Sequence, residues 1–284
     1  MRTRHTVVST LALFAACAAP RPAPVPRAVF VEGEAGRLAV QDFGGLEPAV
    51  VLLHGLGGDA DVWRAQVADL CGRQGRHVVV YDQRGHGRSS PARDGVYTVD
   101  ALAVDLDLVI RELGLHRVVL VGHSFSGTVL TAYASAHPET VVGLVYLDAV
   151  GDFSALPQDQ IAPMLARDAG LDVAGRRAAF AEMLEPRARP RTREQVLVTL
   201  DRLDPPAFAA LRRSMAAFPG RKRYARYHGP AVAIEAAGNE FPATASRALG
   251  VPRVEIAGVS HWLMLDDPEA TNAALDAFLR RVAR

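Results

Sequence analysis

A serine near the middle of the chain lies in a segment that could position it as a nucleophile. Ser124 follows an apolar run at 117–121 that predicts a buried strand, and a helix is predicted after it at 127–136. The residues two before and two after the serine are Gly122 and Ser126, which are small enough for a sharp strand-to-helix turn. A hydroxyl held in such a turn can attack a carbonyl carbon once a base accepts its proton. A purely structural turn is the alternative.

Two further loops follow predicted strands and carry residues suited to the same chemistry. His261 lies after the last predicted strand and before the last predicted helix, and an imidazole can serve as a general base. An earlier loop contains His54 and Gly55, followed by more glycines, directly after the predicted strand 49–53. Its backbone N–H groups could bind developing negative charge or a phosphate. No Gly-Lys-Ser or Gly-Lys-Thr follows, which argues against a phosphate-binding P-loop.

These loops resemble the motifs of serine hydrolases of the α/β-hydrolase fold superfamily that carry a helical cap. Segment 122–126 is similar to the G-x-S-x-G nucleophile elbow, with serine in place of its last glycine. Residues 54–55 are similar to the HG motif, and 82–89 to the D-x-R-G-x-G-x-S loop, whose Asp and Arg we expect to be structural. The resemblance extends over residues 28–284.

The resemblance implies a role for each matching residue. Ser124 would be the nucleophile and His261 the general base. The backbone amides of Leu56 and Phe125 would form the oxyanion hole that binds the negative charge of the tetrahedral intermediate. His123 occupies the variable position beside the serine, where we expect it to pack in the elbow.

The acid that would orient His261 has two candidates. Most relatives carry an Asp in a turn after the strand that follows the cap, but no Asp occurs between Pro230 and Asp266. Glu240 lies near that position, one residue short of the usual spacing. Asp148 ends the strand before the cap, where some haloalkane dehalogenases of this fold carry their acid. We favour Asp148 and keep Glu240 as the alternative.

Strands and helices alternate along the chain in the pattern of a parallel sheet with helices on both faces. Segments 28–32 and 37–42 predict an antiparallel hairpin. Short apolar runs predict buried strands at 49–53, 77–81, 117–121, 141–147, 231–236 and 253–257. Helical patterns predict helices at 61–71, 99–113, 127–136 and 268–282. The fold class is therefore α/β, with a mostly parallel central sheet.

Residues 151–228, which we call the cap, lack any buried-strand pattern. Four helices are predicted there, at 158–168, 175–184, 193–203 and 207–218, with Gly170 and several prolines between them. The cap has 13 Arg and one Lys against nine acidic residues and is therefore basic. The core would then consist of 28–150 and 229–284, with the cap lying over the site and selecting the substrate.

The first 27 residues predict an export signal and a spacer. Basic residues precede a short apolar run at 7–16 that cannot span a bilayer as a helix. The run leads into Phe-Ala-Ala-Cys ending at Cys17, which resembles the lipobox of bacterial lipoproteins, and 20–27 is proline-rich. We therefore expect an exported protein, periplasmic or anchored in a membrane through lipidated Cys17. Ordinary cleavage near Ala16 or Ala19 is the alternative. Cys71 is predicted to be a core residue.

Composition excludes several other classes of protein. The chain has 284 residues, of which 49% are apolar, and 32 basic residues against 31 acidic ones. A net charge of +1 gives no reason to expect a nucleic-acid partner. We expect a hydrolase without cofactor or metal that cleaves a small or medium carboxylic ester, lactone or amide through an acyl-enzyme at Ser124. The alternative is a non-catalytic binding protein of the same fold.

Overall fold

The computed structural model describes residues 25–184 and 186–282, and within these ranges the strands form one eight-stranded sheet. The strand order is β1-β2-β4-β3-β5-β6-β7-β8. β1 pairs antiparallel with β2, and β2 with β4, while the other neighbours are parallel. The strands are β1 (Arg27–Gly33), β2 (Gly36–Asp42), β3 (Leu46–Leu53), β4 (Arg76–Tyr81), β5 (Val118–His123), β6 (Val141–Leu147), β7 (Ala231–Ala236) and β8 (Arg253–Ile256).

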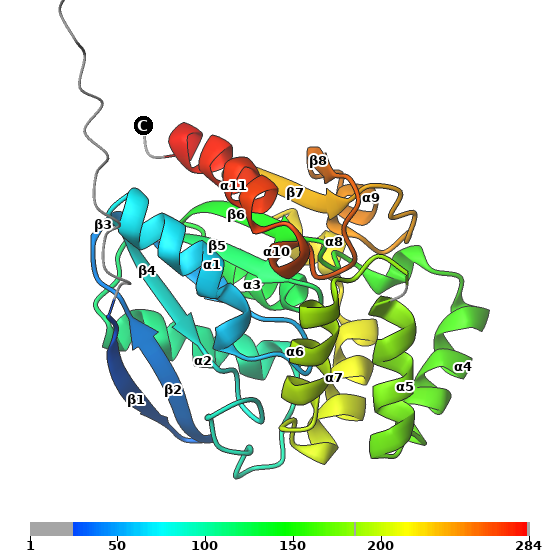
Figure 1. The fold of residues 1–284 in the computed structure, drawn as a ribbon. Helices are drawn as coiled ribbons and strands as arrows, with labels where there is room; N and C mark the ends of the chain where they lie inside the picture. The colour runs from blue at the N-terminus through cyan, green and yellow to red at the C-terminus, as the bar shows by residue number, and fades with distance from the viewer. Residues whose placement is uncertain (1–24, 185, 283–284) are drawn as a thin grey trace, which may run out of the picture.

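Helices cover both faces of the sheet. Helices α1, α10 and α11 lie on one face with η1 and η2, and α2, α3 and α8 lie on the other (Figure 1). The core helices are η1 (Ala60–Trp63), α1 (Arg64–Val67), η2 (Ala68–Arg73), α2 (Val99–Glu112), α3 (Ser126–Ala136), α8 (Gly220–Tyr224), α9 (Ala245–Leu249), α10 (Leu263–Asp266) and α11 (Pro268–Val282). The central strands are therefore buried on both faces, and Val50, Leu120 and Leu144 are fully shielded from solvent. The predicted α/β fold class with a mostly parallel sheet is confirmed.

The helices predicted for the cap are also present between β6 and β7, although α8, which lies within residues 151–228, packs on α3 with the core helices. The helical insert begins after η3 (Phe153–Ala155) and contains α4 (Gln158–Ala169), α5 (Val173–Leu184), α6 (Pro190–Leu200) and α7 (Pro205–Ala217). Helix α4 packs on α7 and α5 packs on α6. In Figure 1 the four helices stand together at one end of the sheet, in green to yellow.

The helices predicted at 61–71, 193–203 and 207–218 have different bounds in the structure. The single helix predicted at 61–71 is divided into η1, α1 and the π-helical η2. Pro190 and Pro205 belong to the prolines that the sequence places between helices, but they are the first residues of α6 and α7. Proline suits this position because its fixed φ is helical and the N–H that it lacks has no partner there in any case.

The predicted export signal, including Cys17, lies outside the described residues and stays a prediction. Among the described helices, none has the length and apolar character needed to cross a membrane. Cys71 is half-buried against the core, and burial raises the pKa of its thiol to about 11. A thiol in this state is a poor nucleophile, which agrees with a packing role.

Candidate active site

The candidate nucleophile lies in a strained turn between β5 and α3. Ser124 has a φ of 57° and Asp148 a φ of 44°, and they are the only non-glycine residues with positive φ in the part of the chain that the structure describes. Such a backbone is costly and is typical of functional sites. The Ser124 Oγ lies 2.8 Å from Nε2 of His261.

Two glycines allow the elbow to close. A Cβ atom on Gly122 would lie 2.1 Å from Cδ2 of Leu130, and one on Gly127 would lie 2.4 Å from the carbonyl oxygen of Val150. Both distances are far below van der Waals contact. The second clash is with backbone, which cannot move aside as a flexible side chain can. Packing therefore explains the glycines at 122 and 127 on either side of Ser124.

His261 is bonded to Asp148 on its other side. Its Nδ1 lies 2.7 Å from Oδ2 of Asp148, the leading candidate for the acid. Because a carboxylate only accepts hydrogen bonds, Nδ1 carries the proton, and Nε2 is left to accept from the Ser124 hydroxyl. Ser124, His261 and Asp148 therefore form a continuous chain of hydrogen bonds.

The backbone and the side chain of Asn239, which the sequence analysis did not single out, hold Asp148 in its ionised form. Its Oδ1 accepts from the Ala236 amide and from Nδ2 of Asn239, each at 3.0 Å. Burial alone would raise the pKa of this carboxyl, but the bonds from His261, Asn239 and Ala236 outweigh burial, and the pKa is lowered. Asn239 follows β7, where most relatives carry their Asp, so its position was a signal that could have been used.

Glu240 is not brought to His261. It is paired with Arg247 on the surface, its side chain is 73% exposed, and it forms no hydrogen bond with the imidazole. The alternative prediction of Glu240 as the acid is therefore wrong, because the turn after β7 directs Asn239, and not Glu240, toward the site.

His123 holds the loop that carries the base. Its Nε2 donates to the carbonyl oxygen of His261 at 2.9 Å. Burial lowers the pKa of His123 to about 3, so the ring is neutral. Its Nδ1 packs on Gly55, where a Cβ atom would approach that nitrogen to 2.6 Å. The histidine predicted only to pack in the elbow thus also fixes the base.

The loop after β3 lies against the elbow and presents the expected oxyanion donors. Leu56 and Phe125 both line the cavity beside Ser124, and among the described residues neither amide N–H has a hydrogen-bond partner. A Cβ atom on Gly55 would lie 3.1 Å from Cβ of Ser124, so only glycine permits this approach. The two free amides are suited to bind an oxyanion.

A buried polar network joins this loop to the elbow. The Ser126 hydroxyl donates to the carbonyl oxygen of His54 at 2.6 Å, and Nε2 of Gln83 donates to the same oxygen at 2.8 Å. The backbone N–H of Gln83 in turn donates to Nε2 of His54. The serine that replaces glycine in the elbow motif therefore fastens the oxyanion loop.

The charged residues of 82–89 have structural partners, as expected. Asp82 accepts from the amides of Ala60 and Arg88, and Arg84 forms a bidentate pair with Asp105 at 2.6 and 2.7 Å. Asp105 and Arg84 are both buried, so this pair holds the loop against α2.

The triad opens into a cavity of about 570 Å³ between the sheet edge and the cap. The core contributes the triad and Trp262, while the cap contributes mostly apolar side chains, among them Phe180 and Phe208. This volume suits a small or medium organic substrate. No group of three His, Cys, Asp or Glu placed to hold a metal occurs among the described residues.

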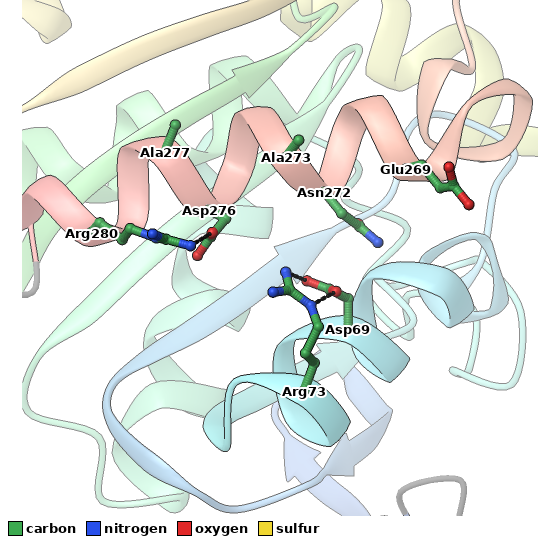
Figure 2. Close-up of a pocket in the computed structure, with 8 residues that line it drawn as sticks. All are labelled: Asp69, Arg73, Glu269, Asn272, Ala273, Asp276, Ala277 and Arg280. Atoms are coloured by element: carbon green, nitrogen blue, oxygen red, sulfur yellow. Dashed lines mark hydrogen bonds and ion pairs between the residues drawn. The ribbon is translucent and has the colours of Figure 1, made fainter. Parts of the chain in front are cut away.

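A second hollow lies between η2 and α11 (Figure 2) and shares no residue with this cavity. Figure 2 shows one ion pair on each wall, Arg73 with Asp69 on η2 and Arg280 with Asp276 on α11. Four of its charged side chains form these two pairs, and the remaining one, Glu269, is exposed, so we assign the hollow no chemistry.

The fold, the elbow and the triad define an α/β hydrolase, and the family comparison agrees. Residues 48–226 match the model of the alpha/beta hydrolase fold family, so the chain belongs to this family. It is 39% identical over 101 residues to a putative carbamate hydrolase, RutD, of Variovorax paradoxus, a match that covers 36% of this chain and 38% of that protein. The chain thus spans well under half the length of the curated relatives that it matches.

Solved structures resemble the whole domain. A thermophilic esterase from Thermogutta terrifontis is 25% identical, with a TM-score of 0.76 over 90% of this chain and 99% of that one. The enol-lactonase of Burkholderia xenovorans LB400 is 21% identical, with a TM-score of 0.75 over 89% of this chain and 100% of that one, a likeness of fold alone.

Proposed function

We propose that the protein is a serine hydrolase that cleaves small or medium carboxylic esters through an acyl-enzyme at Ser124. The observation that carries the proposal is the hydrogen-bonded chain from Asp148 through His261 to Ser124, which ends in a largely apolar cavity. Lactones and amides are variants of the same chemistry. The Thermogutta terrifontis esterase among the structural neighbours supports this class of substrate.

In the first half of the reaction, Oγ of Ser124 bonds to the carbonyl carbon while its proton moves to Nε2 of His261. The carbonyl oxygen becomes an oxyanion and is bound by the Leu56 and Phe125 amides. The bond from carbon to the leaving oxygen then breaks, and His261 gives its proton to that oxygen. The alcohol leaves, and the acyl group stays on Ser124.

In the second half, water attacks the acyl carbon and gives a proton to Nε2 of His261. The bond to Ser124 breaks, the proton returns to Oγ, and the acid is released. Asp148 stays ionised throughout and stabilises the imidazolium in both halves, which its lowered pKa allows.

Two features argue against other functions that proteins of this fold can have. A serine at the elbow disfavours the chemistry of epoxide hydrolases and haloalkane dehalogenases, which in this fold use an Asp nucleophile. The hypothesis of a non-catalytic binding protein depended on the missing Asp after β7. The bond between His261 and Asp148 removes that reason.

Hydrolysis of 4-nitrophenyl acetate, butyrate and octanoate by the wild type and by S124A tests the proposal. We expect turnover of at least one ester by the wild type and a loss of about 10⁴-fold or more in S124A. Equal rates in the two proteins, or no turnover by a folded wild type of any of these esters or of matched lactones, would favour the binding protein.

We also propose that the chain is exported and lipidated at Cys17, on the pattern of its first 27 residues. Expression of the wild type and of C17A in a Gram-negative host with labelled palmitate tests this proposal. We expect label and membrane association only in the wild type, whereas an unlabelled, soluble wild type would contradict lipidation.

A further inference from the structure

The cap places a buried ion pair in the wall of the cavity. Asp168 at the end of α4 and Arg212 on α7 both line it. Nε of Arg212 donates to Oδ2 of Asp168 at 2.7 Å, and the Asp168 side chain is only 3% exposed. A carboxylate buried to this extent holds the guanidinium in one orientation.

The pair leaves the outer edge of the guanidinium unused. The Cζ of Arg212 lies 5.9 Å from the ring centroid of Phe153, so the ring and Asp168 together orient the group. Among the described residues, Nη1 and Nη2 of Arg212 have no hydrogen-bond partner. Their N–H groups form a fork with the geometry of a carboxylate.

The local charge also favours an anion. Arg167, whose side chain is 62% exposed, lies 3.8 Å from the other oxygen of Asp168, so two guanidinium groups, only one of them shielded from solvent, accompany one carboxylate. Glu182 and Arg187, the other charged side chains that the cap contributes to the cavity, are exposed and cancel in charge. The buried Asp168 carboxylate needs a guanidinium partner, because removing its charge from water is costly unless the charge is paired.

We propose that Arg212 binds a carboxylate of the substrate, so that the preferred substrates are esters bearing a second, ionised carboxyl group. This inference rests on the proposed function, because it deepens the choice of substrate at the same site. Arg212 is then a specificity-determining residue, while Asp168 positions it.

Two pairs of esters test the proposal, each pair differing only in charge. Mono-4-nitrophenyl adipate and its methyl ester place the carboxylate on the acyl side. 4-(Butyryloxy)benzoate and its methyl ester place it on the alcohol side. Rates are corrected for spontaneous hydrolysis and compared in the wild type, R212Q, R212K and R213Q. Arg213 is the matched control, an exposed arginine next in sequence that does not line the cavity.

We expect R212Q to lower kcat/KM for the charged ester of at least one pair by about tenfold to a hundredfold. The methyl esters should stay within about threefold, which also shows that the variant is folded. R212K should retain part of the preference, since it keeps the charge but loses the fork. R213Q should change none of these values. Equal losses on charged and neutral esters, or no loss on either charged ester, would overturn the proposal.

Binding of the charged esters to unreactive S124A, measured by calorimetry, separates this inference from the proposed function. Binding that weakens at least tenfold in S124A/R212Q supports the carboxylate site even if the wild type turns over no ester. Hydrolysis of the neutral esters with no dependence of binding or rate on Arg212 refutes the carboxylate site and leaves the hydrolase intact.

Discussion

The cavity has two walls, and they are built from different kinds of contact. Loops form the sheet-edge wall. They are held in place by tight contacts at glycine, as at Gly127, and by buried hydrogen bonds, as at Asp148. The cap wall is formed mostly by apolar side chains, together with the pair of Asp168 and Arg212 and with Arg187, whose Nη1 donates to the carbonyl oxygen of Ala237.

This difference separates two properties of the site. The sheet-edge wall fixes the reacting atoms, so a change there should slow every substrate. The cap wall contacts the parts of a substrate that do not react, so a change there should reorder substrates. Four predictions test the sheet-edge half of the comparison, and the Arg212 variants test the cap half.

Replacing the acid should have the largest effect. D148N removes the charge that keeps the proton on Nδ1 of His261, and we expect kcat to fall by about 10⁴-fold on every ester. E240Q is the matched control, because Glu240 is exposed and paired with Arg247. Nearly full activity in D148N together with a large loss in E240Q would assign the acid to Glu240.

Asn239 should have a smaller effect of the same kind. N239A removes one of the two bonds to Oδ1 of Asp148, and a hydrogen bond to a charged group contributes about 1.5–3 kcal/mol. We expect kcat to fall by about tenfold to a hundredfold, with KM little changed, because Asn239 acts through the acid. Steady-state kinetics check this, and a rise in KM without a fall in kcat would show that Asn239 binds substrate instead.

The glycine contacts can be tested by adding one methyl group in the elbow and one in the cap. In G127A the new Cβ meets the Val150 carbonyl, and we expect a loss of about 1–3 kcal/mol in the free energy of unfolding. In G170A of the cap the nearest atom is 3.7 Å away, so we expect a change within about 0.5 kcal/mol. Denaturant unfolding measures both, and equal stability of the two variants would contradict the elbow packing.

Because His86 and His123 are buried in the core, we expect the free energy of unfolding to depend on pH. Burial lowers the pKa of His86 and His123 to about 3, whereas an unfolded histidine titrates near about 6.5. Between these values the unfolded chain binds more protons, so the free energy of unfolding falls as pH falls from 7 to 5.

Each of these histidines contributes up to about 1.4 kcal/mol per pH unit to that slope. H86Q should make the slope shallower, while H228Q should not, because His228 of the cap is exposed. Denaturant midpoints at pH 7, 6 and 5 measure the slope, and an unchanged slope in H86Q would mean that His86 titrates normally in the folded protein.

The residues that depend on local sequence could be predicted directly, whereas Asp148 is favoured only through the resemblance to some haloalkane dehalogenases. The strand before Ser124, its small neighbours and the loop of Leu56 are patterns within a few residues. The contact between Asp148 and Asn239 depends instead on the pairing of β6 with β7, where Leu147 lies beside Ile234. That register brings the end of β6 to the turn that carries Asn239, and no local pattern contains it.

The same limit applies to the cap and to the short helices. The sequence predicted four cap helices separated by glycine and proline, but it could not show that Asp168 and Arg212 meet, since α4 and α7 are distant in sequence. Helices α8, α9 and α10 contain four or five residues each, too few for a periodic pattern.

A fluorophosphonate probe gives the most direct test of the central claim, that Ser124 is the activated nucleophile. The probe forms a stable bond only with a serine whose proton a neighbouring base removes. We predict one adduct per chain by intact mass, located on Ser124 by peptide mapping, and none in S124A or in the denatured protein. A folded wild type that stays unlabelled, or an adduct on another serine, would contradict the claim.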